Sequence, residues 1–248
     1  MNCQIPSLDY GKLRDYLVEK IINYRKNGQL IIGVSGGVDS AVCAYLAVKA
    51  MGAKNVSAYL MPSTKEGLEV SEKLGLEYEI VDINPIVKAV ELVSGKITDK
   101  LVLGNLKSRI RMALLYRYSN EKNGRVVGTS NKSEMEMGYF TKYGDGGVDF
   151  EPIGDLVKGE VYGLAELAVA EGFLPKCVLE IEPSAGLWDG QTDELEIGMT
   201  YEKIDRMVRG LESYNEKMQK MHDTSRNKTE PPPVFEINIK EFMLGGKV

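Results

Sequence analysis

Six consecutive residues, Ser35-Gly36-Gly37-Val38-Asp39-Ser40, carry the groups that a phosphate-binding loop needs. They stand between an apolar run at residues 30–34 and an apolar stretch of helical composition at residues 41–47. Two adjacent glycines and short hydroxyl side chains allow several backbone N–H groups to converge on one anion, and the N-terminus of the following helix points at the same place. We therefore expect this loop to bind phosphate.

Asp39 distinguishes this loop from a Walker A motif. That motif needs a lysine beside its Ser or Thr, and here an acidic residue occupies the position. A carboxylate repels a polyphosphate unless a cation lies between them, and Mg²⁺ is usually held by one or two carboxylates together with substrate phosphates. Asp39 is therefore interpreted as a Mg²⁺ ligand. The alternative is a tight turn capped by Ser40 or Asp39, which would explain neither the paired glycines nor both serines.

The loop is similar to the S-G-G-x-D-S loop of the ATP pyrophosphatases, which cleave ATP between its α- and β-phosphates to adenylate a substrate. Within that superfamily the chain resembles the NAD synthetases. The resemblance rests on further blocks in the family's order, at residues 105–112, 128–134, 138–149, 152–158, 183–188 and 190–194. It implies a ligase of NAD biosynthesis that forms a C–N bond. Deamido-NAD would be amidated with ammonia through an acyl-adenylate, with release of AMP and pyrophosphate.

The resemblance also implies where ATP and its metal bind. ATP contacts are implied for Gly33, Val34, Ser35, Gly36, Gly37, Val38, Asp39, Ser40, Met61, Thr129, Lys158 and Ser184. Glu134 is implied as the second metal ligand, and the alternative is a first-turn glutamate that complements a helix dipole. Lys158 is expected to act in catalysis, because it would supply the positive charge that the Walker lysine supplies elsewhere.

Deamido-NAD contacts are implied by the same resemblance for Arg109, Lys142, Asp149, Asn227 and Lys228. On the expected helix, Arg109 is two residues from both Lys107 and Arg111, so the three cannot all face one ligand. The family usually carries a His-Lys pair near its C-terminus, whereas this chain has Asn227 before Lys228. Asn227 offers an amide hydrogen bond without a titratable charge.

The stretch Gly144-Asp145-Gly146-Gly147 is expected to be a mobile loop that closes over a ligand. Asp145 is the candidate catalytic residue for ammonia, because ammonia is mostly protonated at neutral pH and a carboxylate can bind the ammonium ion or take its proton. The alternative is an ordinary turn residue.

The elements that must position these residues follow from the apolar pattern. Strand-like runs recur at residues 30–34, 56–61, 78–82 and 125–129, with helical stretches between them. This alternation predicts an α/β fold with three layers, in which a doubly wound, mostly parallel sheet has helices on both faces. The resemblance implies that the sheet is of ATP pyrophosphatase type. The Ser35 and Thr129 loops should then share one rim of the sheet. Gly75 is expected just past a helix end, and Asn105 is expected to cap the next helix.

Length and composition narrow the classes of protein. The chain has 248 residues, 43% of them apolar, and a net charge of −5, which suits one sizeable α/β domain. With the resemblance, this length implies a single NAD synthetase domain over residues 1–248 and no glutaminase domain. No apolar run suits a signal peptide or a membrane span, so a cytoplasmic protein without a membrane partner is expected. The acidic balance disfavours nucleic acid. The implied partners are ATP, deamido-NAD, ammonia and a second copy in a homodimer.

Two other functions stay open. The chain could be another adenylating amidase or thiolase of the same superfamily, which would lack the block at residues 142–149. It could also be a non-catalytic nucleotide-binding module, since a doubly wound fold alone permits that. The acids Asp39 and Glu134 argue against such a module, because it has no departing pyrophosphate to stabilise. The sequence leaves the physiological nitrogen donor open.

Overall fold

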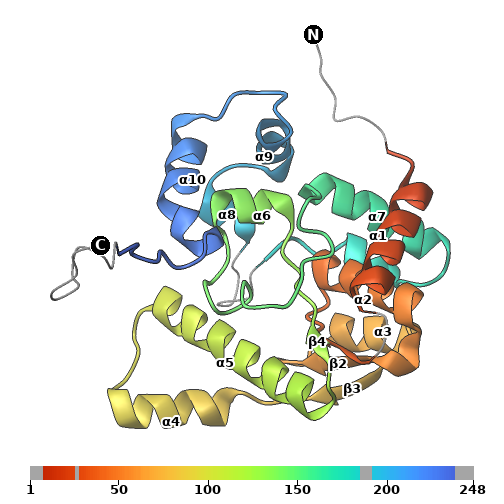
Figure 1. Ribbon diagram of the computed structural model, residues 1–248, viewed down its shortest axis with the longest axis horizontal. Coiled ribbons are helices and arrows are strands. Elements are labelled where there is room, and N and C mark those ends of the chain that lie inside the picture. The colour runs from red at the N-terminus through yellow and green to blue at the C-terminus, as the bar shows by residue number, and fades with distance from the viewer. Residues whose placement is uncertain (1–7, 26–27, 185–191, 238–248) are drawn as a thin grey trace, which may run out of the picture.

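The computed structural model describes residues 8–25, 28–184 and 192–237 (Figure 1). Residues 185–191 of the blocks named above, Trp188 among them, lie outside the described residues. No helix in the described part of the chain is long and apolar enough to cross a membrane.

The sheet has four parallel strands in the described residues, in the order β3-β2-β1-β4. Their bounds are β1 (Leu30–Gly33), β2 (Val56–Leu60), β3 (Glu77–Ile80) and β4 (Arg125–Val126). Leu30 of β1 pairs with Val56 on one side and Arg125 on the other. The strand order therefore reverses beside β1, and a crevice opens at such a switch point. The parallel sheet is confirmed, although β4 ends at Val126, three residues before the predicted end.

Helices cover both faces of this sheet (Figure 1). Leu30 and Ile32 of β1 pack in one apolar core with α1 (Tyr10–Tyr24), α2 (Val38–Met51) and α7 (Lys158–Ala170). Ile31 points to the opposite face and packs with α4 (Asn84–Ser94) and α5 (Lys100–Glu121). Alternate residues of a strand face opposite sides, so both sides of β1 are apolar because both are buried. The predicted three layers are confirmed.

A third apolar cluster lies beyond the carboxyl ends of the strands. Met137, Ile197, Ile204 and Met218 join α6 (Lys132–Met137), α8 (Asp193–Ile197), α9 (Tyr201–Val208) and α10 (Glu216–Thr229). Shorter elements complete the described chain: α3 (Lys65–Lys73), η1 (Ala53–Asn55) and η2 (Lys176–Leu179). The cluster brings α8, α9 and α10 over the rim of the sheet (Figure 1).

Two predicted helix boundaries have different outcomes. Gly75 follows the C-cap of α3 with φ +65°, so its role at a helix end is confirmed. The prediction for Asn105 was wrong. The helix α5 begins at Lys100, and the side chain of Asp99 caps it by accepting from the Val102 N–H at 3.0 Å. Asn105 therefore lies inside the helix.

Candidate functional site

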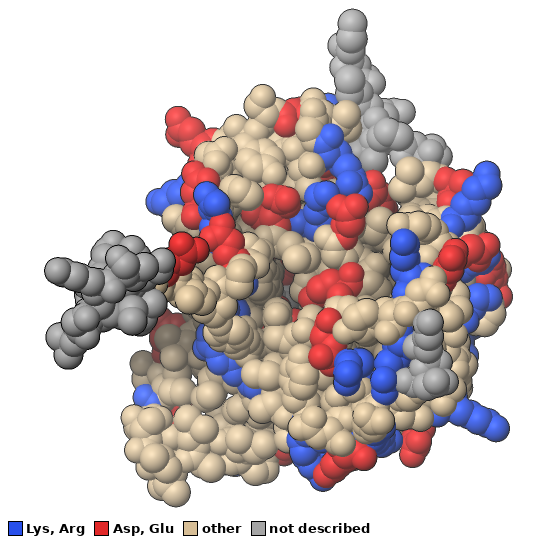
Figure 2. Space-filling view, viewed as in Figure 1, with Lys and Arg blue, Asp and Glu red and all other residues tan. Residues whose placement is uncertain are grey.

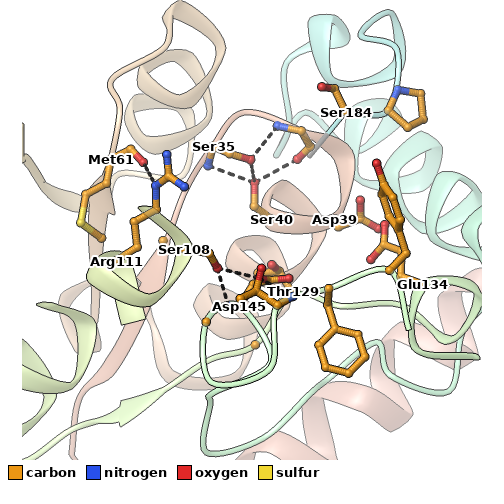
Figure 3. A pocket seen from close by; sticks show the side chains of 18 of the residues that line it. Ser35, Asp39, Ser40, Met61, Ser108, Arg111, Thr129, Glu134, Asp145 and Ser184 are labelled. Atoms are coloured by element: carbon orange, nitrogen blue, oxygen red, sulfur yellow. Dashed lines mark hydrogen bonds between the residues drawn. The ribbon is translucent and has the colours of Figure 1, made fainter. Parts of the chain in front are cut away.

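A cavity of about 600 Å³ opens at the carboxyl ends of β1, β2 and β4 (Figure 3). Every residue predicted to contact ATP lines it, from the loop at residues 33–40 to Met61, Thr129, Lys158 and Ser184. Glu134, Asp145 and Lys228 line it as well. The two predicted loops after β1 and β4 thus share one rim, as the strand order requires.

The loop between β1 and α2 is held by its own serine hydroxyls and leads into a helix whose N-terminus no side chain caps. Gly36 has φ +93°, a conformation that favours glycine. Ser35 Oγ lies 3.1 Å from Ser40 Oγ, and Ser40 Oγ donates to the Gly37 carbonyl at 3.0 Å. The N-cap of α2 is Gly37, and no side chain caps the helix. The Ser40 hydroxyl also accepts from the Ser35 N–H at 3.2 Å, so the turn is held by Ser40 as the alternative expected, while the first turn of α2 still presents N–H groups to the cavity.

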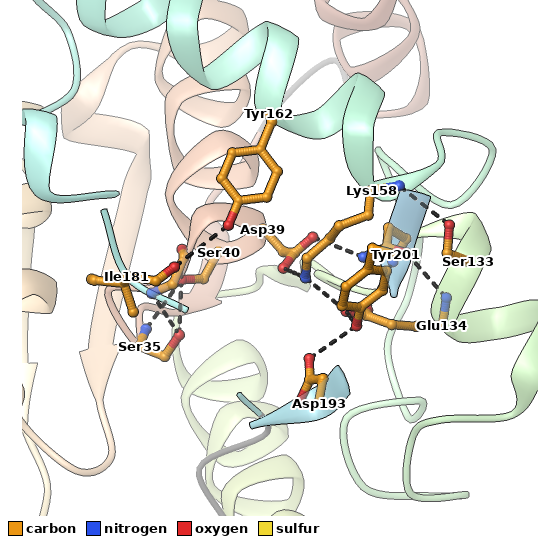
Figure 4. A network of polar contacts seen from close by, with 12 residues as sticks. Ser35, Asp39, Ser40, Ser133, Glu134, Lys158, Tyr162, Ile181, Asp193 and Tyr201 are labelled. Atoms are coloured by element: carbon orange, nitrogen blue, oxygen red, sulfur yellow. Dashed lines mark hydrogen bonds and ion pairs between the residues drawn. The ribbon is translucent and has the colours of Figure 1, made fainter. Parts of the chain in front are cut away.

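Lys158 joins two carboxylates from different elements (Figure 4). Its Nζ lies 2.7 Å from Asp39 Oδ2 and 3.1 Å from Glu134 Oε1, and only 3% of its side chain is exposed. Burial acts to lower the pKa of Lys158, but the charges of Asp39 and Glu134 outweigh it and raise the pKa well above its usual range. Asn131 Nδ2 donates to the other oxygen of Asp39 at 2.9 Å. Lys158 is thus a buried, permanently charged group, not a solvated lysine.

Glu134 has a structural contact as well as a contact in the cavity. Its Oε2 accepts from the backbone N–H of Asn131 at 3.2 Å, and its own N–H donates to Asn131 Oδ1 at 3.0 Å, which together form a capping box. Its Oε1 faces Lys158. Burial raises the pKa of Glu134 to about 7, against the opposing effect of Lys158. The first-turn role and the cavity role are both present.

Tyr201 and Asp193 complete this polar network, and the sequence assigned no role to either. The Tyr201 hydroxyl donates to Asp193 Oδ2 at 2.9 Å and lies 3.4 Å from Glu134 Oε1 (Figure 4). Its ring lies 4.8 Å from Lys158 Nζ. Tyr201 begins α9, so the C-terminal cluster orients the acids of the cavity.

The donor set fits a magnesium ion that is shared with a ligand. Among the described residues no group of three or more His, Cys, Asp or Glu side chains could hold a metal. Asp39 and Glu134 offer two hard carboxylates close enough to contact one ammonium group. Mg²⁺ is commonly bound by one or two carboxylates plus substrate phosphates, so the residues present suit that ion and not an all-protein cage.

Asp145 is held in place by α5. Ser108 Oγ donates to Asp145 Oδ1 at 2.6 Å and accepts from the Asp145 N–H at 2.9 Å. The Thr141 N–H also donates to Oδ1, at 3.0 Å. One carboxylate oxygen is thereby fixed while the residue is exposed at the cavity wall (Figure 3).

Four of the predicted deamido-NAD residues lie together beside the cavity. Arg109 Nε donates to the Lys142 carbonyl at 3.3 Å, and Lys142 Nζ donates to the Asn227 carbonyl. Lys228 Nζ donates to the carbonyls of Gly138 and Phe140 at 2.6 and 2.8 Å, and of these four residues Lys228 lines the cavity. Asp149 lies apart from them. Its Oδ2 accepts from the Val126 N–H of β4 at 2.7 Å, so it anchors the sheet.

The face of α5 toward the cavity carries residues at helical spacing. Leu101, Asn105, Ser108, Arg111, Met112 and Leu115 line the cavity. Arg109 is exposed on another face, which confirms that Arg109 and Arg111 cannot serve one position. Arg111 had no predicted role of its own, and only its place in the block at residues 105–112 could have indicated it.

Known proteins match almost the whole chain. The family model for NAD synthase matches residues 10–241. An NH(3)-dependent NAD(+) synthetase of Archaeoglobus fulgidus is 45% identical over 84% of this chain and 88% of its own. Two solved structures are 35% identical over 92% of this chain. An NMN synthetase from Francisella tularensis has a TM-score of 0.80 over 97% of its chain. An NH3-dependent NAD synthetase from Campylobacter jejuni has a TM-score of 0.71 over 100% of its chain.

Proposed function

This chain belongs to the NAD synthase family, and we propose that it converts deamido-NAD, ATP and ammonia to NAD, AMP and pyrophosphate. The observation that carries this proposal is that the phosphate loop at Ser35 and the Asp39–Lys158–Glu134 cluster, which shares Asp39 with that loop, line one cavity. The enzyme is accordingly a ligase that forms a C–N bond.

Amide formation from a carboxylate needs a leaving group, because oxide does not leave and ammonia would only take the proton of the carboxylic acid. Adenylation supplies that group. The nicotinate carboxylate attacks the α-phosphorus of ATP, pyrophosphate leaves toward the N–H groups of the Ser35 loop, and ammonia then displaces AMP from the acyl-adenylate. Lys158 offsets charge on the phosphates, and the cavity holds the two reactants in register.

Mg²⁺ would be held by Asp39 and Glu134 together with phosphate oxygens, and its charge would stabilise the departing pyrophosphate. Asp145 would receive ammonium and take its proton, with Oδ1 fixed by Ser108. Arg109, Lys142, Asn227 and Lys228 would bind the dinucleotide at the cavity mouth, and Asp149 would contribute from the edge of β4.

A homodimer is part of this proposal. Large apolar side chains are exposed on α4 and at the start of α5: Ile86, Leu92, Val93, Leu101 and Val102. Figure 2 shows few charged side chains over this region. We call these five residues the α4–α5 patch. Contiguous apolar surface commonly marks an interface, and α5 also lines the cavity, so a second copy seated here would adjoin the site.

The test is one assay with deamido-NAD, ATP and Mg²⁺, with either ammonium or glutamine as nitrogen source. We expect NAD, AMP and pyrophosphate when ammonium is the nitrogen source, because the proposed enzyme is a single domain that uses free ammonia. We also propose that it works in the cytoplasm. Formation of ADP and phosphate, or AMP formation that ignores deamido-NAD, would refute it.

The similarity to an NMN synthetase favours a second candidate, amidation of nicotinate mononucleotide at the same cavity. The reacting carboxylate would be identical, and the difference lies in the adenylyl half of the dinucleotide. The ratio of kcat/KM for the two substrates decides between the candidates.

A further inference from the structure

Three cations line the cavity among the described residues: Lys158, Lys228 and Arg111. Lys158 pairs with two carboxylates, and Lys228 donates to two backbone carbonyls. Arg111 has no carboxylate partner among the ion pairs of the described chain. Its Nε donates to the backbone carbonyl of Met61, which follows β2 (Figure 3).

The terminal nitrogens of Arg111 remain available. A guanidinium has five N–H donors, and the bond to Met61 uses the one on Nε. In the part of the chain that the structure describes, Arg25 Nε is the one buried side-chain nitrogen or oxygen without a partner. The terminal nitrogens of Arg111 are therefore accessible, and they face the cavity that Arg111 lines.

Burial lowers the pKa of Arg111, and the charge of Asp145 acts in the opposite direction. A cation withdrawn from water without a counter-ion is costly, and an anion placed beside it offsets that cost. Arg111 lies one helical turn after Ser108, which anchors Asp145, and it shares the cavity with the Ser35 loop. The guanidinium of Arg111 therefore shares one cavity with the backbone N–H groups of the Ser35 loop, which are expected to bind phosphate, and with Asp145, the candidate for binding ammonium.

We propose that Arg111 binds an anionic oxygen of the substrates at the reacting centre. Two sources share this chemistry, the α-phosphoryl group of ATP and the carboxylate of deamido-NAD, and the acyl-adenylate joins them. The inference rests on the proposed function. Arginine suits both anions, because its planar fork donates two parallel hydrogen bonds to a carboxylate or a phosphate. Arg109 does not compete for this role in the cavity, since it is exposed and donates to the Lys142 carbonyl.

The test compares Arg111→Ala and Arg111→Lys with Arg117→Ala. Arg117 lies on the same helix, is 55% exposed and pairs with Glu121 at 2.8 Å, so it is a matched control. We expect Arg111→Ala to lower kcat/KM roughly 10- to 100-fold, since a hydrogen bond to a charged group is lost. Arg117→Ala should stay within about twofold. Arg111→Lys keeps the positive charge and the long aliphatic chain but removes the planar fork, so it tests the same contact if Arg111→Ala folds poorly.

Calorimetric titrations of ATP and of deamido-NAD into each variant distinguish the two sources. Weaker binding of ATP alone assigns Arg111 to the phosphoryl group, and weaker binding of deamido-NAD alone assigns it to the carboxylate. Added guanidinium should restore binding and turnover to Arg111→Ala but leave Arg117→Ala unchanged, a response that a purely structural arginine would not give. Unchanged affinity for both ligands would overturn the inference.

The titrations also separate this inference from the proposed function. If the unmodified protein binds both ligands but forms no NAD, the proposed function fails, while the comparison of Arg111→Ala with Arg117→Ala still decides the role of Arg111. If the protein forms NAD and Arg111→Ala does so equally well, the role of Arg111 fails alone.

Discussion

Lys158 is the shared cation of two acids, Asp39 and Glu134. Each acid keeps a buried ammonium partner when the other is neutralised, so neither substitution leaves Lys158 without a counter-ion. The structural cost of changing one acid is therefore smaller than the loss of a whole ion pair would suggest. The functional cost is separate, because each acid is also a proposed metal ligand.

Asp39→Asn and Glu134→Gln should each lower kcat on the order of 100-fold while the folded structure is retained, because each removes a charge that balances the departing pyrophosphate. The measurement is kcat as a function of Mg²⁺ concentration. Asp155→Asn is the control, since Asp155 is an exposed acid whose partner is Lys132. Near-normal turnover of either variant at limiting Mg²⁺ would remove that residue from the metal site.

Glu151 holds the loop that contains Thr129 through a hydrogen bond to the Ser130 backbone, and ionisation of its carboxyl group should lower the free energy of unfolding. Its Oε2 accepts from the Ser130 N–H at 3.0 Å, and burial raises the pKa of Glu151 to about 8. Between the unfolded pKa near 4.5 and the folded value, the native state binds the extra proton. Stability therefore falls as pH rises through this window, by at most about 1.4 kcal/mol per pH unit from this residue. Glu151→Gln should flatten that slope in denaturant titrations, and an unchanged slope would contradict the assignment.

At the scale of elements, the loop between β1 and α2 depends on a glycine that nothing else can replace. A Cβ on Gly36 would lie 2.7 Å from both Glu66 Cβ and the Gly67 nitrogen, which belong to α3. Any side chain at this position must displace either the loop or the helix. The phosphate site is thus shaped by α3 as well as by its own sequence.

Gly36→Ala should weaken ATP binding strongly, whereas Gly52→Ala should not. Gly52 also has a positive φ, +77°, but no atom lies within 4 Å of the place that a Cβ would take there, so it shares the backbone strain without the clash. We expect Gly52→Ala to cost about 1 kcal/mol of stability and to leave the ATP affinity intact. Isothermal titration of both variants with ATP gives the comparison, and equal affinities would show that the tight approach to α3 is unimportant.

Only some of the elements that form the site could be predicted from the sequence. The Ser35 loop and its neighbour at Thr129 were predictable, because each follows a buried apolar strand and parallel strands end at one rim. The cavity face of α5 was not predictable, because the packing of the helix against β1 and β2 decides which of its residues point inward. The role of Tyr201 and the hydrogen bond that anchors Asp149 could not be predicted from the sequence either, because both depend on contacts between distant segments.

At the scale of the whole molecule, the α4–α5 patch is the surface that a second copy should cover. Leu92 and Val93 are each 88% exposed at the end of α4, far more than a stable apolar surface favours in water.

The double variant Leu92→Lys and Val93→Lys should shift the protein to a monomer and lower its activity, because two charges oppose apolar association. Sedimentation at the assay concentration measures the first effect and kcat/KM for deamido-NAD the second. Tyr16→Lys changes an exposed apolar residue on α1, away from the patch, and should leave both unchanged. A fully active monomer would rule out a role for the interface.

The separation of Lys158 from Asp39, 119 residues along the chain, has a consequence for synthesis on the ribosome. The Ser35 loop leaves the ribosome roughly ten seconds before its lysine, at ordinary rates of translation. Tyr201, which holds Glu134, emerges 67 residues after its partner. A growing chain that ends before α7 therefore offers ATP a set of backbone N–H groups beside an uncompensated carboxylate. We therefore expect ATP to be bound and consumed only once the last elements of the cavity have been made.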